Sequence, residues 1–201
     1  MTDARRTAPA ASRNRDPILE VLRRHVPERG LVLEVASGSG EHCVHFAPAL
    51  GPDLGFQPSD PDAASRASID AWVAAAGVTN VRPAAELDAE AAQWPVTNAD
   101  AVLCINMIHI SPWGATVGLM RGAASVLPVG GMLYLYGPFR REGRHTAASN
   151  AEFDASLRAT NPAWGVRDLE AVVEVAIASG FGPPMVEEMP ANNLSVIFRR
   201  T

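Results

Sequence analysis

The chain has 201 residues, which suits one folded domain, and 47% of them are hydrophobic, which favours a globular core over disorder. A formal net charge of −5 argues against a nucleic acid or an anionic membrane as the main partner, since both select a basic surface. The chain contains no lysine, so phosphate loops and Schiff-base enzymes that depend on one are excluded.

Short apolar runs alternate with amphipathic stretches from residue 31 to residue 136. A first helix is expected to begin near Pro17. After it, the pattern predicts β-strands at Leu31–Ala36, Leu54–Gln57, Val81–Ala84, Ala101–Asn106 and Met132–Tyr136. It predicts helices between them near Glu41–Leu50, Asp62–Ala76 and Pro112–Leu127. Strands that alternate with helices favour a mostly parallel sheet with helices on both faces.

The last third of the chain differs from the rest. The stretch GPFRREGRHTAASN is expected to form a polar loop. Ser149 and Glu152 form a capping-box pattern for a helix over Asn150–Ala159, and a second helix is predicted over Arg167–Ser179. The end, PPMVEEMPANNLSVIFRR, predicts an antiparallel hairpin that closes the sheet.

The sequence also indicates a compartment and argues against a metal site. No apolar stretch is long enough to cross a bilayer, and the opening MTDARRTAPAASRNRDP lacks the apolar region of a signal peptide. Cys43 and Cys104 do not form a CxxC pair. His42 and His45 share one predicted helix, but no third ligand is placed beside them. We therefore expect a cytoplasmic protein without a bound metal.

A glycine-rich turn follows the strand at Leu31–Ala36. Gly38 and Gly40 would begin the dinucleotide fingerprint G-x-G-x-x-G, but a cysteine stands where its third glycine belongs. Glu34 and Glu41 flank the turn, and their carboxylates would repel a pyrophosphate. The turn therefore argues against an NAD(P)-dependent reductase, which we keep as one alternative.

A second register accounts for the acidic residue. Glu34, Ala36, Gly38 and Gly40 form E-x-A-x-G-x-G, which resembles motif I of the class I S-adenosylmethionine-dependent methyltransferases. S-adenosylmethionine has no phosphate, and Glu34 can attract its ammonium while the following helix N-terminus receives its carboxylate. The resemblance makes these residues and Ser37 candidate cofactor contacts. Ala36 replaces the first glycine of the motif and suggests a wider turn.

Two further acidic residues extend the candidate cofactor site. Asp60 ends the second strand, 20 residues after Gly40, where a carboxylate can bind both ribose hydroxyls; Pro61 follows it. An N-cap for the next helix is the alternative role of Asp60. Asp88 matches the place where such methyltransferases hold the adenine amino group, with a simple surface loop as the alternative.

The stretch ADAVLCINMIHISPW ends the fourth predicted strand near Asn106. In this class of fold the residues after that strand lie beside the transferred methyl group, so Asn106 and Met107 are candidate cofactor contacts. His109 is a candidate general base; orienting the substrate or capping the next helix are its alternatives. Trp113 either walls the substrate pocket or packs in the core.

Across nearly its whole length the chain resembles one family of methyltransferase-like proteins. The family is DUF938, which includes the methyltransferase-like 26 proteins of animals, and the similar stretches are SRNRDPILEVL, LEVASGSGEH, QPSDPD, NMIHISPW, LYGPFRREGRHTAASNAEFDASLR, WGVRDLE and EMPANNLSVIFR. The resemblance implies the α/β class I methyltransferase (Rossmann-like) fold, with a seven-stranded, mostly parallel sheet, an antiparallel C-terminal strand and S-adenosyl-L-methionine as cofactor. With no repeat and no linker, we expect one domain over residues 1–201, of which residues 1–11 are flexible.

Three elements can cover a substrate beside the methyl group: the N-terminal segment, the loop after the fifth strand and the helix after that loop. Asn14 is a candidate cofactor contact, because tails in this fold often close over the cofactor. Tyr136, Arg140, His145 and Asn150 are candidate substrate contacts. Arginines bind carboxylates and phosphates, which would select an acidic substrate; a solvated charge run is the alternative.

The expected function is methyl transfer from S-adenosylmethionine to a small molecule by in-line displacement, with an anionic acceptor if the loop arginines bind it. We expect no nucleic-acid or membrane partner, and monomer and homodimer both stay open. A non-catalytic protein that keeps the fold for cofactor sensing or as a scaffold is the second alternative. A collapsed pocket and an exposed apolar surface would favour that alternative.

Overall fold

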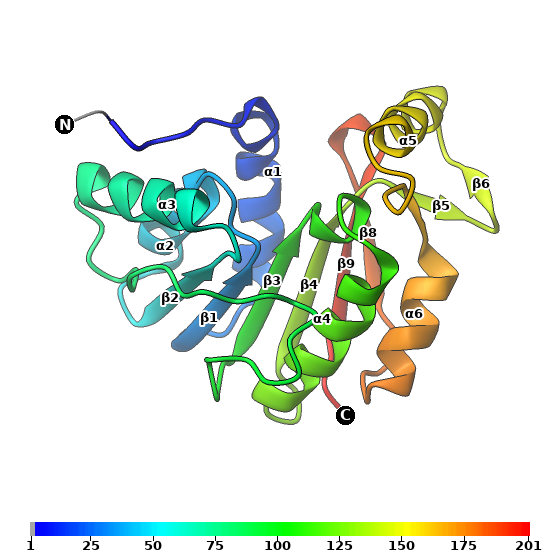
Figure 1. Cartoon of the computed structure of the whole chain (residues 1–201). Coiled ribbons are helices and arrows are strands. Elements are labelled where there is room, and N and C mark those ends of the chain that lie inside the picture. Colours follow the sequence, from blue (N-terminus) through cyan, green and yellow to red (C-terminus); the bar gives the residue numbers. More distant parts are fainter. Residues whose placement is uncertain (1–2) are drawn as a thin grey trace.

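The computed structural model describes residues 3–201, and its centre is a six-stranded sheet (Figure 1). The strands are β1 Gly30–Val35, β2 Leu54–Ser59, β3 Ala101–Ile105, β4 Met132–Gly137, β8 Met185–Met189 and β9 Asn193–Arg199. Their order is β2-β1-β3-β4-β9-β8, with the first four parallel and the last two antiparallel to their neighbours. The predicted α/β class and the antiparallel C-terminal hairpin are therefore confirmed.

Helices cover both faces of this sheet. The helices are α1 Pro9–His25, α2 Glu41–Leu50, α3 Ala63–Ala76, α4 Trp113–Val126, α5 Ala148–Thr160 and α6 Leu169–Ala178. α1, α2 and α3 pack on one face, α4 and α6 pack on the other, and α5 lies near the carboxyl end of β4 (Figure 1). A second, small sheet has the order β6-β5-β7 and consists of β5 Phe139–Arg141, β6 Arg144–His145 and β7 Arg167–Asp168.

Alternating residues along the strands divide the interior into two apolar cores. Val32 and Leu103 pack with α1 and α2, whereas Leu33 and Val102 pack with α4 and the C-terminal part of the chain. A sheet covered on both faces needs apolar side chains at every position, which is why these strands form continuous apolar runs in the sequence. Polar residues are thereby pushed to the loops at the carboxyl edge of the parallel strands.

The sheet has six strands where we predicted seven. The stretch predicted as a strand, Val81–Ala84, lies beside β2 but contributes only one isolated bridge, Phe56 with Val81; a second, Ser59 with Ala85, follows directly after it. Pro83 interrupts this stretch and has no N–H to donate to a ladder. The chain therefore follows the edge of the sheet there without forming a regular strand.

The N-terminal helix begins earlier than predicted, at Pro9 and not near Pro17. Before it, the backbone of Arg6 bonds to two side chains of α3: its N–H donates to Ser68 Oγ at 2.8 Å, and its carbonyl accepts from Trp72 Nε1 at 2.8 Å. Flexibility of residues 1–11 stays a prediction, and the first two of them lie outside the described residues.

Two predicted details of the C-terminal third are wrong. The stretch predicted as a polar loop contains β5 and β6, which turn through Glu142 and Gly143. The predicted capping box is also absent: α5 begins one residue before Ser149, and Ala147 occupies the N-cap with no side-chain hydrogen bond. The pattern signalled a helix correctly but misplaced its first turn, because Ser149 and Glu152 are both inside it.

Candidate functional site

The glycine turn lies between the carboxyl end of β1 and the start of α2. Ala36, Gly38 and Gly40 all have left-handed backbone conformations, with φ of 57°, 58° and 92°. A Cβ at Gly40 would lie 2.7 Å from the Cα of Ile69 in α3, whereas a Cβ at Gly38 would meet nothing within 4 Å. Gly40 therefore permits close packing of α3, and Gly38 leaves open space above the turn. Ala36 keeps the conformation that glycine favours.

Ser37 joins the ends of the two strands that carry the candidate site. Its N–H donates to Ser59 O at 2.8 Å, and its Oγ donates to Glu34 O at 3.1 Å. The same Oγ accepts the N–H of Ser59 at 3.1 Å. Ser37 is buried, so the contacts that the structure records for it hold β1 against β2.

Glu34 is a buried carboxyl directly beneath this turn. Glu34 is the last residue but one of β1 and is 1% exposed. Its Oε2 has no hydrogen-bond partner within residues 3–201. Burial raises its pKa from 4.5 to about 7, and the nearby charge of Asp60 acts in the same direction. An unpartnered buried carboxyl would gain from a cationic group placed beside it.

Asp60 follows β2 and faces the same turn. Its carboxylate accepts the N–H of Gly38 and the N–H of Asp62, both at 3.0 Å. Burial raises its pKa, and these two hydrogen bonds oppose the shift. The cap of α3 is Asp62, whose side chain accepts from Ser65 N at 2.9 Å. The alternative role of Asp60 as the N-cap is therefore wrong, while Pro61 is an exposed residue between the two acids.

Asp88 lies on the loop that follows the two isolated bridges. It is exposed, and its Oδ1 accepts the backbone N–H of Glu90 at 2.9 Å. These contacts match the surface-loop alternative; no hydrogen bond in the described part of the chain joins Asp88 to the glycine turn.

The end of β3 leads into a single 3-10 turn, η1 Met107–His109. β1 and β3 are neighbours, with Val35 opposite Cys104, so the glycine turn and Asn106 extend from adjacent strand ends. Asn106 has a φ of 64°, and its N–H donates to Tyr136 O at 2.8 Å. Met107 is buried in the core that α4 shares.

The structure does not suit the prediction that His109 is a general base. The ring is fully buried, and its Nδ1 accepts the backbone N–H of Arg167 at 3.2 Å. Burial lowers its pKa to about 3, with the charge of Arg167 adding to the shift. Within residues 3–201 its Nε2 has no hydrogen-bond partner; it faces the Cα of Gly137, where Asn106 Oδ1 also approaches. The 3-10 turn thus directs the ring into the interior, whereas Asn106 lines the cavity.

A cavity of about 970 Å³ opens over the carboxyl ends of β3 and β4, between α1 and α5. Its walls come from α1, the ends of β3 and β4, α5 and the hairpin turn between β8 and β9, a 3-10 helix η2 Pro190–Asn192. The lining residues are Ala10, Arg13, Asn14, Pro17, Asn106, Ile110, Tyr136, Pro138, Ser149, Asn150, Phe153, Pro190, Ala191, Asn192 and Asn193. Four predicted site residues, Asn14, Asn106, Tyr136 and Asn150, meet there.

Asn14 connects the N-terminal helix to the interior. Its Oδ1 lies 2.8 Å from His42 Nε2, and the nearby amide of Asn14 opposes the rise in the pKa of Tyr136 that burial causes. His42 stacks on Phe46, and burial lowers the pKa of its imidazole to about 4. The prediction that this segment closes over the site fits the position of Asn14, although its partners here are protein groups.

The charged loop residues do not reach the cavity. His145 Nε2 lies 3.5 Å from Asp154, and Arg141 pairs with Glu188 at 3.2 Å. Arg140 sits in β5, paired across the small sheet with His145 and Asp168. Of the predicted contacts in this region, Asn150 alone lines the cavity; its Nδ2 donates to Thr146 Oγ1 and to Asn192 O. Carboxylates of β8 and α5 thus account for the orientation of Arg141 and His145.

Trp113 is the first residue of α4 and packs against the core that α4 and α6 share. The guanidinium of Arg167 lies 5.6 Å from its ring centroid. Trp113 is not among the residues that line the cavity, so the packing alternative describes its position.

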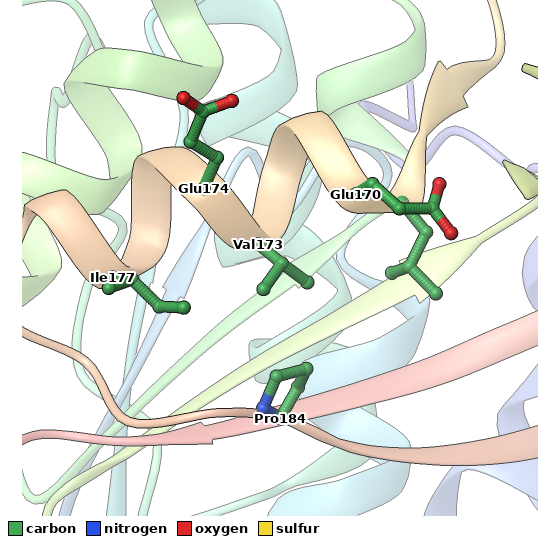
Figure 2. A pocket seen from close by; sticks show the side chains of 6 residues that line it. Glu170, Val173, Glu174, Ile177 and Pro184 are labelled. Carbon is green, nitrogen blue, oxygen red and sulfur yellow. The ribbon is translucent and has the colours of Figure 1, made fainter. Parts of the chain in front are cut away.

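A second hollow lies on the outer surface of α6 and shares no lining residue with the cavity. Figure 2 shows Val173, Ile177 and Pro184 around this groove of about 460 Å³, with Glu170 and Glu174 at its margin. Ile177 is 53% exposed. The groove offers apolar contact but no cluster of polar groups for chemistry.

No group of three or more His, Cys, Asp or Glu side chains in residues 3–201 is arranged to hold a metal ion. His45, one of the two histidines considered for this role, pairs with Asp16 at 2.8 Å. None of the helices in the same residues is long and apolar enough to cross a membrane.

Sequence reasoning missed eleven of the fifteen residues that line the cavity. Arg13, Asn192 and Asn193 lie in stretches that the family resemblance singled out, SRNRDPILEVL and EMPANNLSVIFR, but no spacing rule connects them. Phe153 and Ile110 are apolar residues, and a hydrophobic pattern alone predicts that such residues pack in the core. Only the fold brings these five together.

The sheet order and the turn at the end of β1 define the class I methyltransferase (Rossmann-like) fold. Solved structures with the same fold include a putative O-methyltransferase from Nostoc punctiforme (TM-score 0.82, 17% identity), an O-methyltransferase family protein from Burkholderia thailandensis (0.78, 17%) and human N-acetylserotonin methyltransferase in complex with S-adenosylmethionine (0.75, 14%). They cover 96%, 96% and 95% of this chain, which itself spans 57%, 57% and 52% of theirs. At these identities the likeness shows the fold alone.

The family follows from the sequence. Residues 5–200 match the family described as protein of unknown function DUF938, and the chain belongs to it. The predicted family resemblance is thereby confirmed over almost the whole chain.

Proposed function

We propose that this protein is an S-adenosylmethionine-dependent methyltransferase that acts on a small molecule. The observation that carries the proposal is the adjacency of two features at one sheet edge: a glycine turn over the buried, unpartnered carboxyl of Glu34, and an open cavity that begins at Asn106. When bound, S-adenosylmethionine would supply an electrophilic methyl group on a sulfonium. Proteins of the same fold that bind this cofactor, such as human N-acetylserotonin methyltransferase, support the proposal.

The residues around the turn have the chemistry to hold such a cofactor. Glu34 would neutralise its ammonium, and Asp60 would accept hydrogen bonds from its ribose hydroxyls. The open space above Gly38 would let the ligand approach the backbone closely. We assign the remaining contacts, as proposals, to Ala36, Ser37, Gly40, Pro61, Asp88, Asn106 and Met107.

The residues around the cavity would align the acceptor. Tyr136 is buried, and Asn14 and Asn150 are buried and held by protein hydrogen bonds, so little side-chain entropy is lost when they bind a ligand. Alignment of two reactants can contribute roughly 7–11 kcal/mol to a displacement. His109 acts here as a positioning residue beneath Asn106. We also propose a single domain over residues 1–201 and a cytoplasmic location.

Calorimetric titration tests the cofactor assignment. S-adenosylmethionine and S-adenosylhomocysteine are titrated into the wild-type protein, with NADH as the control ligand. We expect saturable binding of the first two and none of NADH. Asp60→Ala should weaken binding about tenfold or more, which corresponds to about 1.4 kcal/mol.

Two further variants make the result specific. Asp60→Asn keeps an oxygen that can accept the N–H of Gly38, so it separates the loss of a ligand contact from a disturbed turn. Asp53→Ala removes an exposed carboxylate before β2 and should leave binding unchanged. Absence of binding to folded wild-type protein, free of co-purified ligand, would contradict the proposal.

The second candidate function is a non-catalytic scaffold on the same fold. The groove on α6, with Ile177 and Met185 more than half exposed, favours this candidate. The open, amide-lined cavity argues against it, since a scaffold has no use for convergent polar groups in a hollow of this size.

A further inference from the structure

We propose that the cavity over β3 and β4 takes an acceptor that binds as an anion, already ionised before the methyl transfer, with Arg13 as its charged contact. The acceptor atom would belong to a carboxylate, an acidic phenol or a thiol on a small apolar skeleton. This inference rests on the proposed methyltransferase function and names the substrate class of the same site.

The first argument is that the wall contains no base. Among the lining residues of the described chain there is neither a carboxylate nor an imidazole. His109 is fully buried behind Asn106, and its Nδ1 is occupied by the N–H of Arg167. His145 pairs with Asp154 outside the cavity. An acceptor that must lose a proton during transfer would have no group nearby to take it.

The second argument is that Asn14 and Tyr136 bring hydrogen-bond donors to the cavity wall. An amide oxygen only accepts, so His42 Nε2 must donate to Asn14 Oδ1. The Nδ2 of Asn14 is then left as a donor, and the hydroxyl of Tyr136, which also lines the cavity, carries a proton that it can donate. Burial raises the pKa of Tyr136, so the hydroxyl keeps that proton. A donor aimed into the cavity stabilises an anion.

The third argument is charge. Arg13 is the only ionised side chain among the lining residues that the structure describes, and no carboxylate there would compensate a cationic ligand. It is exposed and makes no ion pair within residues 3–201. A guanidinium can give two parallel hydrogen bonds to a carboxylate, which makes it well suited to an anionic group.

The fourth argument concerns the rest of the ligand. Ile110 and Phe153, both lining the cavity, are 44% and 42% exposed, which is unusual for large apolar side chains. Pro138 lies in the same wall. These residues offer apolar area to a carbon skeleton, so an inorganic anion or a polyol would leave them uncovered.

With such an acceptor, the charges of the methyl transfer balance although no proton leaves the acceptor. A lone pair of the anionic oxygen or sulfur forms the new bond to the methyl carbon, while the old carbon–sulfur bond breaks and its electron pair stays on sulfur. The negative charge of the acceptor and the positive charge of the sulfonium cancel. Both products are neutral at the reacting atoms, and no base is required.

Binding without turnover tests the inference. Protein saturated with S-adenosylhomocysteine is titrated, at about pH 8, with three anions and their uncharged counterparts: benzoate with benzamide, 4-nitrophenol with 4-methylphenol, and thiophenol with methyl phenyl sulfide. We expect at least one anion to bind about tenfold more tightly than its counterpart. The pair that shows the preference identifies the class of acceptor atom.

Two variants and a pH series complete the test. Arg13→Gln should remove most of that preference, whereas Arg23→Gln on the same helix, where Arg23 pairs with Glu20, should leave it unchanged. Affinity for 4-nitrophenol should fall as the pH is lowered through its own ionisation, while affinity for benzoate stays constant over that range.

The outcomes separate this inference from the function on which it rests. If S-adenosylhomocysteine binds but the uncharged probes bind as well as the anions, or no probe binds, the inference is overturned and the methyltransferase proposal stands. An anion preference that survives in Arg13→Gln also overturns the role of Arg13. If S-adenosylhomocysteine itself does not bind, the proposed function fails first.

Discussion

The glycine turn and the cavity beside it lie at the same edge of the sheet, but they differ in charge. Beneath the turn, Glu34 and Asp60 are both buried, and they are close enough for the charge of Asp60 to raise the pKa of Glu34. Around the cavity there are carboxamides, a tyrosine and Arg13, and no carboxylate among the lining residues described. One strand interval thus separates a region that favours a cationic ligand group from a region that favours an anionic one.

The largest expected effect concerns the rigidity of the turn. Gly40→Ala should lower the free energy of unfolding by about 4 kcal/mol, because the new Cβ would lie 2.7 Å from the Cα of Ile69 and φ is 92°. Gly38→Ala has open space and should cost about 1 kcal/mol from its left-handed backbone alone. Urea unfolding of both variants measures the difference, and equal losses would contradict this account of the turn.

The next effect tests the acidic half of the site through pH. The folded protein holds a proton on Glu34 up to about pH 7, whereas the unfolded chain releases it near 4.5. The folded state therefore binds more protons in this window, and the free energy of unfolding should fall as the pH rises through it. The loss amounts to about 3 kcal/mol.

Glu34→Gln isolates this contribution. The variant should match the wild type near pH 4 and exceed its stability by about 3 kcal/mol at pH 8, in the absence of ligand. Its affinity for S-adenosylhomocysteine should fall, because the ammonium loses its partner. If the free energies of unfolding of the two proteins change with pH in parallel, Glu34 does not cause the loss of stability.

A smaller effect is expected on the other side of the comparison. Asn14→Ala removes the hydrogen bond to His42 and should cost about 2 kcal/mol of stability, since His42 is buried and its Nε2–H would lose its acceptor. Arg13→Ala, the adjacent exposed residue, should change stability by less than about 0.5 kcal/mol. Thermal unfolding monitored by circular dichroism measures both. A neutral Asn14→Ala would mean that the cavity wall is not held rigid from α1.

The smallest effect concerns the departure from the glycine motif. Ala36 has a φ of 57°, which an L side chain adopts at a cost. Ala36→Gly should relieve this and raise the free energy of unfolding by about 0.5 kcal/mol, after the greater entropy of the unfolded glycine chain is counted. Chemical denaturation in replicate resolves a change of this size, and a loss of stability would mean that the methyl group of Ala36 packs favourably.

Much of the fold could be predicted from local pattern. The apolar runs at β1, β3 and β4 are continuous because both faces of the sheet are covered, and the glycine turn follows β1 in the expected register. The prediction of a seventh strand was wrong because Pro83 has no N–H to donate to a ladder, and the apolar pattern alone takes no account of this.

The site was less accessible to sequence reasoning, for two physical reasons. His109 was chosen because it titrates near neutral pH, but a 3-10 turn buries its ring and removes that property. Arg140 and His145 were chosen as polar groups of the loop, yet Arg140 lies in β5 outside the cavity lining, and Asp154 of α5 pairs with His145. Both outcomes depend on tertiary neighbours, which no spacing in the sequence encodes.

Hydrogen–deuterium exchange with and without S-adenosylhomocysteine tests the location of the cofactor most directly, because it needs no substitution. The account predicts slower exchange in peptides covering residues 36–41, 60–62 and 106–107, with no change in α6 or β8. Protection confined to α6 and β8, or no protection at ligand concentrations that saturate other methyltransferases, would contradict the assignment of the glycine turn as a cofactor site.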